Sequence, residues 1–241
     1  MIINNIMKKA LLVLALIPSL ALSSFALANE NVQLDKAPVD VSNHESLQRG
    51  ARTFVNYCLN CHSANYMRYN RLIEIGLTEQ QIKDNLLFAG DKVGDTMKVA
   101  MNKADAKKWF GVAPPDLSVE VRARGADWVY TYMRGFYRDS TRPTGWNNVA
   151  YDKVAMPHIL YELQGEQTLN HETHELKLTK PGKLSVAEYD SLIGDLTNYM
   201  AFMAEPAKHQ RNRLGWFVLL FLGVLLVLTY KLKKAYWKDI H

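Results

Sequence analysis

The sequence predicts a mostly α-helical domain with short strands and loops, followed by one transmembrane helix near the C-terminus. Three observations support this fold class. Apolar residues recur at helical spacing between Leu47 and Cys58, and again between Tyr189 and Met203. The stretch Leu214–Tyr230 contains no charged residue. The two periodic stretches indicate amphipathic helices packed in a core, and the uncharged stretch indicates a helix surrounded by lipid.

The composition excludes several classes of protein. The 241 residues are 48% hydrophobic and 22% charged, which is typical of a globular chain and not of a disordered polymer or a polytopic membrane protein. Two cysteines are too few for a disulfide framework, a zinc ribbon or a cysteine-ligated iron–sulfur cluster. The formal net charge of +5 is modest, and we expect no nucleic acid among the partners.

The first 28 residues have the pattern of an export signal peptide. Lys8 and Lys9 form a positively charged start, residues 10–22 are almost entirely apolar, and Ala26–Ala28 is a small-x-small cleavage site. We expect cleavage before Asn29. A retained membrane anchor is the alternative, but the apolar stretch is short for a span. Cleavage would remove two lysines and leave 27 basic against 24 acidic residues.

Residues 211–232 form the predicted transmembrane helix. At a rise of ~1.5 Å per residue, Leu214–Tyr230 extends over roughly 26 Å, and flanking lysine and aromatic side chains complete a crossing of about 30 Å. Three basic residues precede the span and four follow it, so charge alone does not decide its orientation. The export signal places residues 29–210 outside the cytoplasm and the tail, residues 233–241, inside.

The stretch CLNCH at positions 58–62 is a CxxCH motif, the attachment pattern of c-type haem. The thiols of Cys58 and Cys61 can add to the two vinyl groups on one edge of the porphyrin. His62, the next residue, is then held under the ring with its imidazole facing the iron. We therefore expect one covalent haem c in a cytochrome c-like haem domain.

Three alternatives compete with haem attachment. A thioredoxin-like CxxC would follow a β-strand, whereas an amphipathic helix precedes this motif, with a capping box predicted from Ser42 and Glu45. A disulfide between Cys58 and Cys61 would close a very small loop, and a chance match is the third alternative. The export signal, the preceding helix and the absence of other cysteines favour haem.

A haem iron also needs a sixth ligand or an open position. Met156 stands directly before Pro157, and proline biases the residue before it toward an extended conformation that suits a strap over a ring. His158 is the second candidate, and the residues alone leave both open. A methionine ligand would give the higher reduction potential. The other methionines lie close to His62, in a polar stretch or in predicted helix core: Met67, Met97, Met101, Met133, Met200 and Met203.

Two weaker signals follow the CxxCH motif. Ser185 and Glu188 form a second predicted capping box, which starts the long helix ending near Met203. His171 and His174 are interpreted as part of a solvent-exposed loop and not as a metal site, with a short strand over residues 175–179.

Short motifs along nearly the whole mature chain resemble those of one protein family. They are Gln48–Ala51, Cys58–His62, Ala113–Ser118, Arg122–Gly125, Pro143–Trp146, Val154–Pro157, Lys180–Lys183 and Ala204–Pro206. In this combination the sequence resembles the cytochrome c1 family, the membrane-anchored haem subunits of quinol–cytochrome c oxidoreductase (bc1) complexes. The likeness is strongest to the proteobacterial branch.

The resemblance implies roles for particular residues. It implies that Met156 is the sixth ligand, that Arg124 pairs with a haem propionate, and that Pro114 and Pro115 line the haem pocket. A guanidinium suits this role because it forms bidentate bonds to a carboxylate. Two departures stand out. Some bacterial members brace the methionine loop with a further cysteine pair, which this chain lacks, and Trp128 stands where the family often has tyrosine.

The resemblance further implies one-electron transfer, with no catalytic residue and no enzyme activity of the chain on its own. The haem would take electrons from a Rieske iron–sulfur protein and pass them to a c-type cytochrome in the periplasm. Cytochrome b would lie beside the anchor, in a dimeric complex of the bacterial inner membrane. An independent membrane-tethered cytochrome c is the alternative, and it would have a smaller haem domain. The about 90 residues between His62 and Met156 favour the larger family. A haem peroxidase would need an open sixth position.

Overall fold

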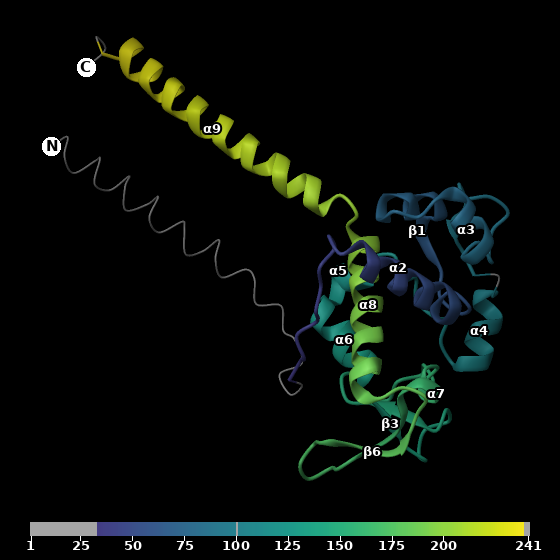
Figure 1. The fold of residues 1–241 in the computed structure, drawn as a ribbon. Coiled ribbons are helices and arrows are strands. Elements are labelled where there is room, and N and C mark those ends of the chain that lie inside the picture. The colour runs from purple at the N-terminus through teal and green to yellow at the C-terminus, as the bar shows by residue number, and fades with distance from the viewer. Residues whose placement is uncertain (1–32, 100, 239–241) are drawn as a thin grey trace. The chain divides into compact units, whose positions relative to one another are not determined.

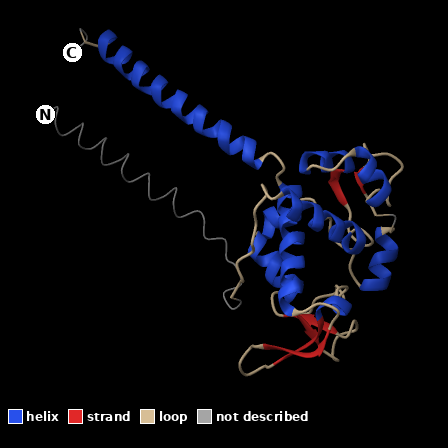
Figure 2. Ribbon diagram, viewed as in Figure 1, coloured by secondary structure: helices blue, strands red, loops and turns tan. Residues whose placement is uncertain are grey.

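The computed structural model describes residues 33–99 and 101–238, so the predicted signal peptide, residues 1–28, lies outside the described residues (Figure 1). Figure 2 shows that helices dominate the described part, which confirms the predicted fold class. The α-helices are α2 (His44–Thr53), α3 (Glu79–Asn85), α4 (Lys103–Phe110), α5 (Glu120–Arg124), α6 (Ala126–Arg134), α7 (Tyr161–Gln164), α8 (Val186–Ala204) and α9 (Lys208–Tyr236). Two turns have another pitch: the π-helix η2 (Phe54–Cys58) and the 3-10 helix η3 (Tyr69–Ile75).

The described strands form three separate two-stranded antiparallel sheets. They pair β1 (Ala64–Arg68) with β2 (Thr96–Met97), β3 (Phe136–Arg138) with β4 (Trp146–Asn148), and β5 (Gly165–Leu169) with β6 (Leu176–Pro181). The strand predicted over residues 175–179 is thus part of β6. Gly165 begins β5 at φ +98°, and a Cβ there would stand 2.2 Å from the carbonyl oxygen of Lys180, so only glycine fits this closely paired corner.

Helices α2 and α8 form the centre of the core. Gly50 of α2 lies against the backbone of α8, where an added Cβ would meet the carbonyl oxygen of Asp195 at 2.0 Å. Beside this contact, Arg49 donates to both carboxylate oxygens of Asp195, at 2.6 and 3.1 Å. One turn further on, the rings of Phe54 and Tyr199 pack with centroids 5.6 Å apart. The helix that leads into the CxxCH motif is therefore held against the longest helix of the domain.

The two predicted helix starts have different outcomes. The Ser185 hydroxyl accepts from the backbone N–H of Glu188, whose carboxylate accepts from the N–H of Ser185, so this capping box is confirmed. The box predicted from Ser42 was wrong. Ser42 donates its hydroxyl to Asp40 at 2.6 Å, and Asn43 caps α2 by accepting from the N–H of Ser46.

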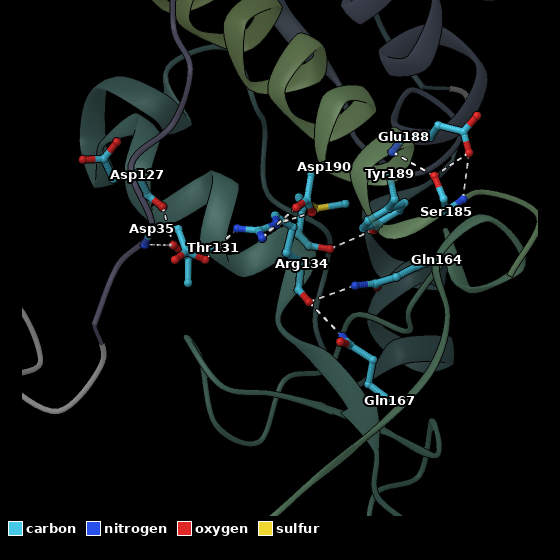
Figure 3. Close-up of polar contacts among 11 residues, drawn as sticks. Asp35, Asp127, Thr131, Arg134, Gln164, Gln167, Ser185, Glu188, Tyr189 and Asp190 are labelled. Carbon is cyan, nitrogen blue, oxygen red and sulfur yellow. Dashed lines mark hydrogen bonds and ion pairs between the residues drawn. The ribbon is translucent and has the colours of Figure 1, made fainter. Parts of the chain in front are cut away.

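Arg134, at the end of α6, joins three parts of the domain (Figure 3). Its guanidinium donates to Asp190 of α8 at 2.6 and 3.0 Å and to Asp35 of the N-terminal segment at 2.6 Å. Its carbonyl oxygen accepts from the side-chain amides of Gln164 and Gln167, which belong to α7 and β5. Each of these partners is distant in sequence. Arg134 therefore links α6 to α8, to the N-terminal segment, to α7 and to the β5–β6 hairpin.

Helix α9 follows α8 after a break at Pro206, where the sequence predicted one. Glu205 accepts from Arg211 at 2.7 Å across this break. Within the described residues, one helix is long and apolar enough to cross a membrane, over Gln210–Tyr236 with a mean hydropathy of 2.1. This segment contains the predicted span, residues 211–232.

Candidate functional site

The CxxCH motif lies at the end of the π-helix η2. The backbone N–H groups of Cys61 and His62 both donate to the carbonyl oxygen of Cys58, at 3.1 and 2.8 Å. Cys58 and Cys61 are free thiols, so the alternative of a disulfide between them does not describe this structure. Burial raises the pKa of Cys58 to about 12, and it also raises the pKa of Cys61. Cys58 is thus a neutral buried thiol, unlike the low-pKa cysteine of a thiol oxidoreductase.

His62 is held in one tautomer by a partner far along the chain. Its Nδ1 lies 2.8 Å from the carbonyl oxygen of Pro115, and the residue is 8% exposed. A carbonyl oxygen can only accept, so Nδ1 carries the hydrogen and Nε2 keeps a free lone pair. Burial lowers the pKa of His62 and so favours the neutral ring, while the hydrogen bond to Pro115 acts in the opposite direction. A neutral imidazole with one nitrogen free is the form that binds a metal.

Met156 is half-buried between the large apolar core and a small cluster formed by Phe136, Trp146 and Val154. The hydroxyl of Tyr132 donates to its Sδ at 3.4 Å. Burial raises the pKa of Tyr132, so this hydroxyl stays protonated and remains a donor.

The loop before Met156 is braced by polar side chains. Asn147 is 4% exposed, and its amide oxygen accepts from the backbone N–H of Lys153 at 2.8 Å. Its amide nitrogen donates to Asp139 and Asp152, at 3.0 and 2.9 Å. Arg142 donates to the carbonyl oxygen of Lys153 at 3.0 Å. No sequence periodicity marked Asn147 or Arg142 as supports of this loop.

His158, the second candidate for the sixth ligand, is 2% exposed. Its ring stacks on Phe136, with centroids 4.8 Å apart, and meets the edge of Trp146 at 5.0 Å. Burial lowers its pKa to about 4, so the ring is neutral near pH 7.

Several of the other methionines are core residues. Met97 lies in a polar stretch of the sequence, yet it is fully buried in β2 and accepts from the hydroxyl of Tyr199 at 3.6 Å. Met67 and Met133 are also buried.

Arg124 lies at the end of a stack that reaches Met156. Its guanidinium stands 4.4 Å from the ring of Trp128, which stacks on Tyr132 at 4.9 Å. Arg124 also donates to Glu120 at 2.5 Å. Arg124 was expected to pair with a haem propionate. In this structure its guanidinium already has a carboxylate partner, Glu120. Trp128, the departure from tyrosine, supplies a flat surface on which the guanidinium rests.

The prolines differ in what they contribute. Pro114 is half-buried, whereas Pro115 is exposed and acts through its carbonyl oxygen on His62. That contact joins positions 53 residues apart, and neither motif alone predicts it.

His171 and His174 are exposed in the turn between β5 and β6, and no group of three metal-binding side chains occurs among residues 33–99 and 101–238.

The residues present fit a covalent haem c. Two free thiols stand at the CxxCH spacing, a neutral imidazole keeps Nε2 available, and a thioether lies against the same core. These features fit the class of c-type cytochromes, and helix α9 is long and apolar enough to cross a membrane.

Comparison with known proteins names the family. The pattern of the cytochrome c1 family matches residues 35–240, and the chain belongs to this family. It is similar to cytochrome c1 of Allochromatium vinosum, with 47% identity over 95% of this chain and 99% of that protein. It is also similar to a Nitrosomonas europaea protein named ammonia monooxygenase gamma subunit, with 53% identity over 98% and 100%. Cytochrome c1 of Rhodospirillum rubrum is 28% identical over 98% and 99%. The chain is thus an electron-transfer protein, a redox subunit and not an enzyme on its own.

Proposed function

We propose that this chain is the haem subunit of a quinol–cytochrome c oxidoreductase complex. It takes electrons from a Rieske iron–sulfur protein and passes them to a c-type cytochrome, while its anchor lies beside cytochrome b in a dimeric complex. The observation that carries the proposal is the donor set, in which His62 is fixed with Nε2 free and Met156 packs against the same core. The 47% identity to a protein named cytochrome c1 supports the choice of complex.

The residues of the chain have separate tasks in this function. Cys58 and Cys61 form the thioether bonds, His62 is the fifth ligand and Met156 the sixth. The haem supplies a reversible one-electron change at its iron. The Pro115 carbonyl keeps the His62 ring in one tautomer, and Tyr132 orients the sulfur of Met156.

The remaining groups shape the edge of the site. Arg124 pairs with a propionate while its guanidinium rests on Trp128, and Pro114 and Pro115 line the pocket. No proton transfer by a side chain is needed, because the reaction moves one electron.

The proposal includes the topology of the chain. Residues 1–28 are a cleaved signal peptide, residues 29–210 form the haem domain in the periplasm, residues 211–232 cross the inner membrane, and residues 233–241 lie in the cytoplasm. The apolar helix over Gln210–Tyr236 supports the single crossing.

A second candidate complex follows from the relative named ammonia monooxygenase gamma subunit, which is 53% identical over nearly the full length of both chains. In that case the chain would serve the same one-electron chemistry beside a different set of subunits. The donor set is common to both candidates, so only the partners distinguish them.

Purification from detergent, with identification of the subunits and a redox titration of the haem, tests the proposal. We expect cytochrome b and a Rieske subunit to co-purify, together with a c-type haemochrome spectrum and a low-spin ferric form with the methionine–iron charge-transfer band. Co-purification with monooxygenase subunits in their place would establish the second candidate. A colourless chain, or a high-spin spectrum, would refute the ligand assignment itself.

A further inference from the structure

Residues 98–99 and 101–115 form an arm whose two ends are held at the CxxCH motif. At its start, the backbone N–H of Val99 donates to the hydroxyl oxygen of Ser63 at 3.0 Å. At its end, the carbonyl oxygen of Pro115 binds Nδ1 of His62. Because Ser63 follows His62 directly, the arm leaves the domain and returns to it beside the same two residues. The base of the arm is therefore next to the residues proposed to hold the haem.

Helix α4 forms the outer part of this arm. Asn102 caps its start by accepting from Ala104, and Gly111 ends it at φ +79°. Ala106 is the one buried residue among its eight, so most of the helix surface has no partner within the described chain. Figure 1 shows α4 at the edge of the helical core. A helix that buries so little stabilises the fold weakly, which leaves its surface free for another role.

The surface of the arm combines positive charge with exposed apolar side chains. It has four lysines and one acidic residue, Asp105, a net charge of +3, whereas the full chain has a net charge of +5. All four lysines are exposed: Lys98, Lys103, Lys107 and Lys108. Trp109 is 66% exposed and Val112 is 52% exposed. Exposed apolar side chains among charges that are mainly of one sign are the composition of a docking surface for a protein of opposite charge.

We propose that this arm is the docking surface for an acidic electron-transfer protein that accepts one electron from this chain. Trp109 forms the apolar contact, and Lys103, Lys107 and Lys108 attract carboxylates of the partner. The bound acceptor is reduced by one electron as the haem of this chain is oxidised by one. This inference rests on the proposed function, because it requires a haem held by His62.

The experiment uses the full-length haem protein in detergent and two matched probes. One probe is a basic soluble cytochrome c, and the other is the same cytochrome after succinylation of its lysines, which makes it acidic. Electron transfer from the reduced chain to each probe is measured by stopped flow over a range of ionic strength. Binding is measured by calorimetry with both proteins oxidised, so that this readout does not depend on turnover.

The variants separate the arm from general charge. Lys107→Glu/Lys108→Glu reverses two charges on the arm, and Lys36→Glu/Lys177→Glu reverses two exposed lysines elsewhere. We expect the arm variant to slow transfer to the acidic probe about tenfold or more at low ionic strength and to weaken its binding, with little effect of the control variant. Trp109→Ala is expected to weaken binding of the acidic probe at high salt as well.

The outcomes are distinguishable. Equal effects of the two charge-reversal variants, or a preference of the wild-type chain for the basic probe, would overturn the proposal while the proposed function stands. An arm variant that loses binding to phosphatidylglycerol vesicles but keeps wild-type transfer would assign the surface to a lipid and also overturn it. A chain without a c-type spectrum would refute the proposed function, and the docking surface with it.

Discussion

Replacement of Gly50 by alanine tests the packing of α2 on α8, which positions the CxxCH motif. Two effects oppose each other. Alanine is favoured over glycine inside a helix by about 1 kcal/mol. The added Cβ, however, would stand 2.0 Å from the carbonyl oxygen of Asp195 and 2.6 Å from Cβ of Tyr199. Most of this obstruction is backbone and Cβ, so no rotation of a side chain relieves it.

The clash is expected to exceed the gain in helix propensity. Overpacking of a well-packed core costs about 1–3 kcal/mol, and a contact this short belongs at the upper end of that range. The net loss of stability is then about 2 kcal/mol. For a domain of this size that corresponds to a fall in Tm of roughly 4–8 °C. The paired groups of Arg49 and Asp195 beside the contact would separate as the helices move apart.

Thermal unfolding followed by circular dichroism, on samples with matched haem content, measures this change. Gly94→Ala is the matched control, since a Cβ at Gly94 meets no atom within 4 Å and its φ is not positive. We expect the control to keep the wild-type Tm within a degree or two. A Gly50→Ala protein as stable as the wild type, or more stable, would contradict the close approach of α2 and α8.

Four further predictions concern the site and its supports. Met156→Leu should leave the haem attached but lower its midpoint potential by on the order of 100 mV in a redox titration, and an unchanged potential would mean that another residue is the sixth ligand. Tyr132→Phe removes a hydrogen bond to sulfur worth about 1 kcal/mol, so the potential should fall by a few tens of mV, whereas a rise would contradict the donor role. Asp190→Asn should lower the Tm more than Asp35→Asn, because the Asp190 carboxylate makes the two-bond contact to Arg134 and is 30% exposed, against 57% for Asp35. Arg138 and Lys180 lower the pKa of Glu166 to about 2 from its ordinary value of 4.5. The carboxylate therefore stabilises the β5–β6 hairpin fully at pH values above 4.5, and this contribution is lost as the pH falls toward 2. Amide exchange of the hairpin should show that loss in the wild type and not in Glu166→Gln.

The sequence predicted those features that depend on neighbouring residues. The box at Ser185 needs only groups three positions apart, and α9 needs only an uncharged apolar stretch, so both were predicted correctly. The box at Ser42 failed for a local reason too. Asp40 takes the hydroxyl of Ser42, and Asn43 offers a better cap one residue later. Where two capping residues compete, the pattern alone does not choose between them.

The contacts that define the site join distant parts of the chain. Pro115 meets His62 across 53 residues, and Tyr132 meets Met156 across 24. Tyr132 stands within a helical pattern that indicated only packing, and nothing in that pattern distinguishes a hydroxyl aimed at sulfur. The donors could be predicted because their residue types are rare and their spacing is fixed. Their supports are common residues, and packing between segments far apart in the sequence brings them into place.

The brace of the Met156 loop shows that polar contacts can take the role of a covalent link. Asn147 accepts from the backbone of Lys153 and donates to two carboxylates, and Arg142 holds the carbonyl oxygen of Lys153. Lys153 has φ +58°, a strained conformation for a lysine that costs on the order of 1 kcal/mol or more. At about 1 kcal/mol each, four such bonds offset that strain and still stabilise the loop by about 2–3 kcal/mol, comparable to the 2–4 kcal/mol of a typical disulfide. A chain whose two cysteines are both needed at the CxxCH motif can therefore hold its methionine loop without a third and fourth.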